Sequence, residues 1–238
     1  MSAALPESAR VIGRLARLFI DSPSSIAPDR CGVGPFTPDM VAAMPPAARA
    51  ALAKPLSAEC GLATVDLTAH IHRLTHEESA RHAGTIATLP AGDLLRLARA
   101  LAAIVYADLA RRLVRKEDRA RFEKAVGTPA ATVAIRRTPF HAPLGRLAPE
   151  GASIADADRP EPASPPSPWT RPTTSALIAG EPPMVRHALT IIAAWTAAIA
   201  PPFGAILRAR FGDFGPTPGL AADQRAALDG VFARQLAP

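Results

Sequence analysis

The sequence predicts an all-α fold, and three observations support this prediction. Hydrophobic residues make up 48% of the 238 residues but aromatic residues only 5%, so the core must consist mainly of aliphatic side chains and alanine. Such a composition favours close helix packing over a β-sandwich. Apolar residues also recur at the spacing of a helix face in several segments, and no segment alternates apolar and polar residues as a half-buried strand does.

Short helices separated by prolines are expected in the N-terminal region. The pattern of apolar residues places them at 11–20, 38–52 and 66–80. Asp39 and Asp66 stand near the starts of the last two, where a carboxylate interacts favourably with the partial positive charge of a helix N-terminus. The prolines between these segments set the breaks.

The clearest helical pattern lies in residues 94–137. A first helix is predicted with one apolar stripe on a helical wheel. The stripe consists of Leu94, Ala98, Leu101, Val105 and Leu109. Asp93 is expected to cap the N-terminus of this helix. A charged turn and a second helix, closed by Gly127, follow it.

The basic residues are concentrated where the first of these helices ends. The chain has a net charge of +6, and almost all of its positive charge is arginine, which forms bidentate contacts with carboxylates and phosphates. We expect a charged contact with an acidic protein surface here. Its predicted residues are Asp108, Arg111, Arg112, Arg115 and Lys116. Asp108 and Arg112 have the i,i+4 spacing of a helical ion pair. A solvated helix end is the alternative interpretation.

Prolines divide the rest of the chain. Eleven of them fall within residues 138–183, where no apolar periodicity is left, so this segment is expected to be a flexible linker. The predicted organisation is therefore a helical N-terminal and central domain at 1–137, a proline-rich linker at 138–183 and a C-terminal helical region at 184–238. The C-terminal region either packs on the first domain or stands apart from it.

Three helices are expected in the C-terminal region, at 184–199, 202–211 and 221–235. Residues 188–207 carry no charge over a length that spans a bilayer. The proline pair at 201 and 202 interrupts this run, and a proline pair starts a new helix more readily than it continues one. We therefore expect two buried helices joined by a bend.

No catalytic, metal-binding or cofactor-binding set is recognised, so the protein is not expected to be an enzyme and no cofactor is predicted. His72 and His76 have the spacing that lets both reach one metal ion, but position 80, where a zinc-protease motif starting at His76 would place its second histidine, is alanine. Cys31 and Cys60 form no CxxC pair and are expected to be small core residues. The N-terminus has no continuous apolar run and predicts no secretory signal, so a cytoplasmic protein is expected.

The order of these elements resembles the YscK/OrgA-type accessory proteins of bacterial type III secretion systems. In that family, a leucine- and alanine-rich helix leads into a basic junction and a short helix ending in glycine, as in residues 94–137 with the run VRKEDRARFEKAVG. A leucine-rich helix, a proline and an arginine-bearing helix follow in the C-terminal part. The corresponding segments here are 184–199, the proline pair at 201–202, and 205–211 with Arg208 and Arg210.

The resemblance implies a non-enzymatic cytosolic adaptor of the sorting platform, recruited to the cytoplasmic face of the inner membrane. Its partners would be the cytoplasmic domain of the inner-membrane ring and the pod-forming platform protein, with membrane contact only through them and no small-molecule substrate. Two alternatives remain open. One is a DNA-binding regulator that uses the basic helix pair, although acidic residues interrupt its positive run. The other is an enzyme with a site at His72 and His76.

Overall fold

The computed structural model describes the following residues: 7–20, 44–45, 47–48, 51, 68–136, 138–154, 178, 180–211 and 216–237. Within these ranges the chain forms helices joined by turns and contains no strand, so the predicted all-α fold is confirmed. The two cysteines and most of the helix expected at 38–52 lie outside the described residues.

The chain divides into two compact units at different places from the three regions expected from the sequence. The first unit contains residues 1–89, 173–175 and 196–213, and the second contains residues 90–172, 176–195 and 214–238. One long helix, α13 (Pro183–Ile199), belongs to the second unit through Trp195 and to the first from Thr196 onward. The C-terminal helices are therefore shared between the units.

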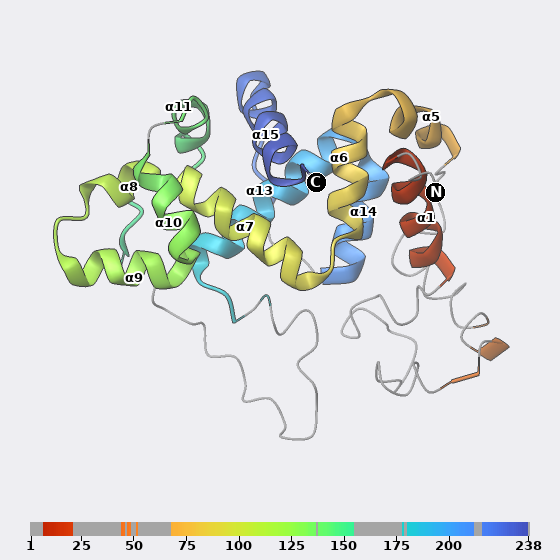
Figure 1. Cartoon of the computed structure of the whole chain (residues 1–238), viewed down its shortest axis with the longest axis horizontal. Helices are drawn as coiled ribbons and strands as arrows, with labels where there is room; N and C mark the ends of the chain where they lie inside the picture. Colours follow the sequence, from red (N-terminus) through yellow and green to blue (C-terminus); the bar gives the residue numbers. More distant parts are fainter. Residues whose placement is uncertain are drawn as a thin grey trace, which may run out of the picture. The chain divides into compact units, whose positions relative to one another are not determined.

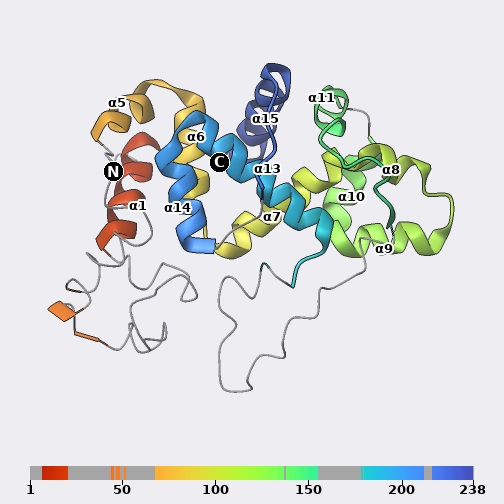
Figure 2. The same ribbon diagram turned by 180° about the vertical axis from the view of Figure 1, so that it is seen from behind.

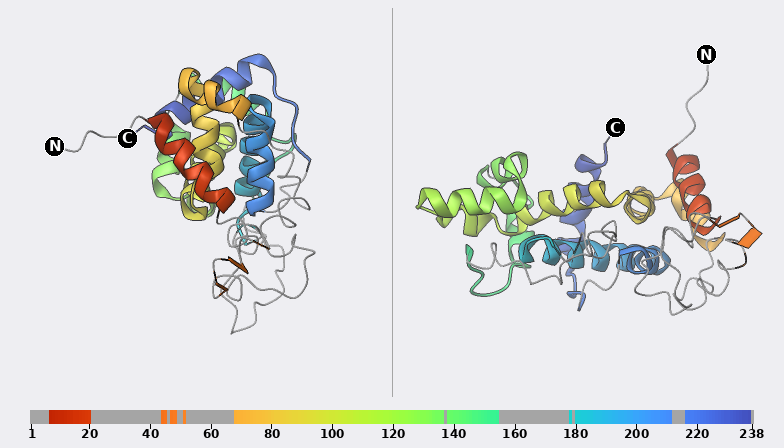
Figure 3. Two further views of the ribbon diagram at one scale, coloured as in Figure 1. Left: turned by 90° about the vertical axis from the view of Figure 1, so that its right-hand side faces the viewer. Right: turned by 90° about the horizontal axis from the view of Figure 1, so that it is seen from below.

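Helix α6 is the centre of the first unit. The helices of this unit are α1 (Glu7–Ile20), α5 (Thr68–His76), α6 (Glu78–Thr88) and α14 (Pro201–Phe211). Helix α6 contacts the other three (Figure 1), and the left view of Figure 3 shows it between α1 and α14. The helix predicted at 66–80 is interrupted at Glu77, whose carboxylate accepts hydrogen bonds from Arg73.

Arginines fix the helix ends of the first unit. Arg73 on α5 donates a hydrogen bond of 2.8 Å to the carbonyl oxygen of Ile199, at the end of α13. Arg210 on α14 donates to the carbonyl oxygens of Ala87, at 2.5 Å, and Leu89, at 3.0 Å. These carbonyls belong to the end of α6, where the helix leaves them without intrahelical partners. Burial lowers the pKa of Arg210 to about 10, so its guanidinium is still charged at neutral pH.

The second unit is built around α7. Its helices are α7 (Ala91–Val105), α8 (Ala107–Arg112), α9 (Lys116–Val126), α10 (Thr128–Ile135), α11 (His141–Gly145), most of α13, and α15 (Ala222–Gln235). Helix α7 contacts α8, α9, α10 and α11. Figure 2 shows α13 crossing α7.

Two polar contacts and an aromatic pair hold this unit together. Arg99 on α7 forms a salt bridge of 2.7 Å with Glu181, just before α13, and the hydroxyl of Tyr106 lies 2.9 Å from Nδ1 of His187. Trp195 meets Phe232 of α15 edge-to-face, with ring centroids 4.6 Å apart and both side chains fully buried. The core therefore joins helices that are distant in the sequence.

The stripe predicted for α7 is confirmed over its first four members. Leu94, Ala98, Leu101 and Val105 are buried, whereas Leu109 is only half-buried because the helix breaks at Tyr106 before α8 begins. Gly127 closes α9 with a φ of +88°, a conformation that glycine adopts without strain.

The prediction that Asp93 caps α7 is wrong. The helix begins at Ala91, and the carbonyl oxygen of Pro90 accepts hydrogen bonds from the backbone N–H groups of Asp93 and Leu94. Asp93 therefore lies within the first turn, where its carboxylate pairs with Arg96 and interacts with the helix dipole. The proline defines the start because its fixed φ suits the entry to a helix.

Residues 138–154, the first part of the expected linker, form α11 and turns with a buried side. His141 and Leu144 are buried, and α11 contacts α7, α8 and α15. Gly230 of α15 permits this close approach, because a Cβ there would lie 2.7 Å from the ring of Phe140. The guanidinium of Arg234 covers the same ring at 4.7 Å.

The predicted break between the two apolar C-terminal helices is confirmed. Helix α13 ends at Ile199 and α14 begins at Pro201, with Ala200 between them. The third predicted helix corresponds to α15. Among the described residues, no helix combines the length and the hydropathy needed to cross a bilayer.

Candidate functional site

Charged residues are concentrated at the corner at which α8 turns into α9. We call residues 111–124 the basic corner. It contains seven arginines and lysines and three acidic residues, a formal net charge of +4, compared with +6 for the whole chain. All five residues predicted to contact a partner lie at or next to it.

Arg111 is held by the fold. Its guanidinium donates to Oδ1 of Asp108, at 2.6 Å, and to Nδ1 of His141 on α11. The backbone N–H of Thr138 also donates to this nitrogen, at 3.2 Å. Because Nδ1 accepts two hydrogen bonds, the proton of the imidazole resides on Nε2 and His141 is neutral. Burial, reinforced by the charge of Arg111, lowers the pKa of His141 and favours this state.

Asp108 therefore pairs with Arg111, three residues ahead, and no bond joins it to Arg112 in the described part of the chain. The predicted i,i+4 pair with Arg112 is not formed. The difference has a structural cause, since α8 has only six residues and its last turn leads directly into the buried side chain of Leu113. The cluster of Asp108, Arg111 and His141 thus connects α8 to α11.

Arg112, Arg115 and Lys116 project from the corner. All three are exposed, and within the described residues their side chains form no hydrogen bond or ion pair. They surround a turn in which Leu113 is buried and Val114 is 84% exposed. The corner therefore presents three free cations around one exposed apolar side chain.

Arg119 fixes the turn from the side of α9. Its Nε donates a hydrogen bond of 2.8 Å to the carbonyl oxygen of Leu113. Phe122, one turn further along α9, is buried. The acidic residues Glu117 and Asp118 lie in the first turn of α9, where they interact favourably with the helix dipole.

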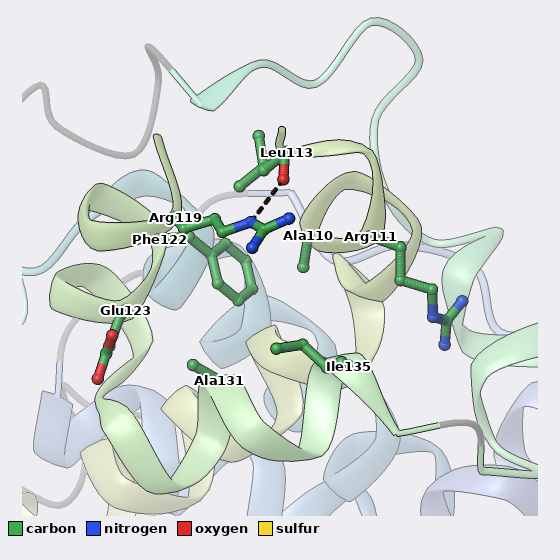
Figure 4. A pocket seen from close by; sticks show the side chains of 8 residues that line it. All are labelled: Ala110, Arg111, Leu113, Arg119, Phe122, Glu123, Ala131 and Ile135. Carbon is green, nitrogen blue, oxygen red and sulfur yellow. Dashed lines mark hydrogen bonds between the residues drawn. The ribbon is translucent and has the colours of Figure 1, made fainter. Parts of the chain in front are cut away.

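A pocket with a cavity volume of about 330 Å³ lies between α8, α9 and α10. Its walls are mainly apolar. The lining residues are Ala110, Leu113, Phe122, Ala131 and Ile135, together with the charged Arg111, Arg119 and Glu123. Figure 4 shows the ring of Phe122 facing the pocket, Arg119 reaching across to Leu113, and Arg111 and Glu123 pointing away from it. Ile135 is 66% exposed although it lines the wall.

The histidine pair predicted on one helix face is found on α5. The rings of His72 and His76 are exposed and lie 4.4 Å apart between centroids. No group of three or more histidine, cysteine, aspartate or glutamate side chains with metal-binding geometry occurs among the described residues. The two histidines share one face of α5, and the described residues supply at most these two ligands to a metal ion there.

Sequence reasoning missed the pocket and His141. The pocket requires three helices to meet, and periodicity within one helix gives no information about such a meeting. His141 lies in a segment whose prolines suppress the helical pattern, and its only signal is the apolar neighbourhood of Phe140 and Leu144. Comparison of the chain with protein-family models, curated proteins and solved structures finds no match.

Proposed function

We propose that the protein is a non-enzymatic adaptor that binds an acidic surface of another protein through the basic corner. The observation that supports this function is the exposure of Arg112, Arg115 and Lys116, which no acidic side chain of the described residues neutralises. Clustered exposed cations raise the association rate with an acidic surface and select against basic ones.

The proposed setting is the sorting platform of a type III secretion system. There the protein would link the cytoplasmic domain of the inner-membrane ring to the pod-forming platform protein. This part of the proposal is supported only by the resemblance of the sequence, namely a helix, a basic junction and a helix closed by glycine, followed by two C-terminal helices separated by prolines.

The test is affinity purification of the tagged full chain from cells that make it, with mass spectrometry of the proteins that accompany it. The informative variant reverses the charge of the corner by replacing Arg112, Arg115 and Lys116 with glutamate. Arg111 is left unchanged, because its bonds to Asp108 and His141 mean that its loss would disturb the fold. Ring and pod proteins are expected with the wild-type chain and not with the variant.

A matched control carries the same change in formal charge at other exposed arginines, with Arg10, Arg14 and Arg225 replaced by glutamate. This control should retain the partners, because its basic corner is intact. Equal recovery of the partners by both variants would disprove the role of the corner. Recovery of partners unrelated to secretion would disprove the setting while leaving the adaptor function in place.

A DNA-binding regulator is the second candidate, favoured by the charge of +4 on a helix–turn–helix of the chain. The exposed acids Glu117 and Glu123 on α9 oppose phosphate binding. Titration with random duplex DNA separates the two candidates. A regulator would bind with a logarithmic salt slope of about −0.9 per phosphate contacted. The adaptor is expected to show no binding at about 0.15 M salt.

A further inference from the structure

The chemistry of the pocket between α8, α9 and α10 indicates an apolar guest. Of the charged residues that line it, Arg111 and Glu123 point away, and Arg119 uses its Nε to donate a hydrogen bond to the carbonyl oxygen of Leu113. Small-molecule sites combine apolar walls with several polar groups that converge on the ligand. Here the guanidinium of Arg119 is the one charged group of the lining that lies at the pocket, and the volume of about 330 Å³ is at the lower end of the range for small-molecule pockets.

Two exposed apolar side chains belong to the pocket wall or follow a wall residue in the sequence. Val114 and Ile135 are, with Ile71, the large hydrophobic residues with the greatest exposure among the described residues. Ile135 forms part of the pocket wall, and Val114 follows Leu113, another wall residue. A partner that fills the pocket would also cover these side chains and remove apolar surface from water.

The charges next to this apolar surface determine which partner fits. Arg112, Arg115 and Lys116 lie within two residues of Val114 in the sequence and are free to pair within the described part of the chain. A partner with acidic side chains on both sides of an apolar residue would satisfy the cations and the pocket together. An amphipathic helix presents this arrangement, with apolar residues three or four positions apart and charges at the edges of the apolar stripe.

We infer that the pocket between α8, α9 and α10 receives an apolar side chain from an acidic amphipathic helix of the partner protein, while the free cations of the basic corner pair with the carboxylates of that helix. This inference rests on the proposed adaptor function. A two-fold pairing of this surface with the same surface of a second copy does not fit, because two corners of charge +4 would face each other. DNA does not fit it either, because phosphates make no use of an apolar pocket.

The first experiment fills the pocket without changing a charge. Ala131→Trp places an indole in the pocket, and Ala120→Trp places the same side chain on the exposed face of α9 as the control. We expect Ala131→Trp to reduce recovery of the partner about tenfold, equivalent to about 1.4 kcal/mol, and Ala120→Trp to leave recovery unchanged. Ile135→Asp tests the same wall at a residue that is 66% exposed and has little role in folding.

The second experiment identifies the guest. The full chain carries the photo-crosslinking residue p-benzoylphenylalanine at Val114 or at Ile135, or at exposed Ala226 on α15 as the control. Mass spectrometry then identifies the crosslinked peptides. We expect the residues at positions Val114 and Ile135 to crosslink to one peptide of another protein, with apolar residues three or four apart among acidic ones, and Ala226 not to do so.

Several results would overturn the inference. In the crosslinking experiment, these are crosslinks to a second copy of this chain or to DNA, crosslinks to a peptide without acidic residues, and no crosslink at all. In the variant experiment, the contrary result is a recovery of the partner that neither Ala131→Trp nor Ile135→Asp changes. The proposed function is judged separately by the charge-reversal variant. If that variant loses the partner and the pocket variants keep it, the adaptor function stands and the pocket inference fails; if the wild-type chain recovers no partner, both fail.

Discussion

Replacing Gly204 with alanine tests how α14 packs against the last turn of α13. A Cβ at this position would lie 2.6 Å from Cβ of Ala197 and 2.9 Å from its Cα. Atoms bonded to a helix backbone cannot rotate away, so relief requires α14 to move. Both residues belong to the first unit, and the substitution therefore acts within one packed core.

The expected magnitude is the balance of two effects. Alanine is favoured over glycine within a helix by about 0.5–1 kcal/mol, which stabilises the folded state. Adding a methyl group to a packed core costs about 1–3 kcal/mol when neighbouring atoms must move. Because the clash here involves backbone atoms, the cost exceeds the gain. We expect Gly204→Ala to lower the free energy of unfolding by about 0.5–2 kcal/mol.

Two other glycines provide matched comparisons. Gly92 in α7 has no atom within 4 Å of the added Cβ, so Gly92→Ala should raise the free energy of unfolding by about 0.5–1 kcal/mol. At Gly84 the Cβ would meet the side-chain ends of Val11, at 2.7 Å, and Leu74, at 2.9 Å, which have some freedom to shift. Urea denaturation followed by circular dichroism should therefore rank the variants in the order Gly92, Gly84, Gly204. A Gly204→Ala protein as stable as the Gly92→Ala protein would refute the close packing of α14 on Ala197.

Three further predictions concern a buried cation, pH and salt. Arg210→Met should lower the free energy of unfolding by about 1–3 kcal/mol, because the carbonyl oxygens of Ala87 and Leu89 lose their donor; an unchanged denaturation midpoint would contradict this. Burial lowers the pKa of both His141 and His187, so each is neutral in the folded chain and takes up a proton more readily in the unfolded chain. Their contribution to stability is thus complete above the unfolded pKa of about 6.5 and is lost as the pH falls below it. The urea concentration at the denaturation midpoint should therefore be lower at about pH 5.5 than at about pH 7.5, and a constant midpoint would contradict this prediction. Affinity for the partner should decrease as salt is raised, because the cations of the basic corner are exposed, and this dependence should be much weaker after their charge reversal. Calorimetric titration at several ionic strengths measures it, and equal salt dependence of the wild-type chain and the variant would contradict the prediction.

Local features of the fold were predictable from the sequence because they depend on neighbouring residues alone. The stripe from Leu94 to Val105 follows from helical periodicity, the end of α9 from the conformational freedom of Gly127, and the break before α14 from a proline that cannot continue a helix. Each of these signals lies within one turn or one face of a single helix.

Features that depend on tertiary packing could not be predicted in this way. Helix α11 forms in a proline-rich segment because α7, α8 and α15 bury its side chains, and a composition rule does not include these neighbours. The choice of Arg111 as the partner of Asp108 likewise depends on His141, which lies 30 residues further along the chain. The five residues of the candidate site could be named from their charges, but their division into structural and exposed residues could not.

For the proposed adaptor, this division would determine how the basic corner binds its partner. Arg111 and Arg119 form hydrogen bonds within the fold. Arg111 joins α8 to α11, and Arg119 holds the turn against α9. Because the turn is fixed at both ends, Arg112, Arg115 and Lys116 project from a rigid support, so less conformational freedom is lost when a partner binds. A corner of the same charge on an unsupported loop would attract the same partner but hold it less tightly. In the proposed adaptor, the arginines that are not free to bind would therefore be the ones that make the exposed cations effective.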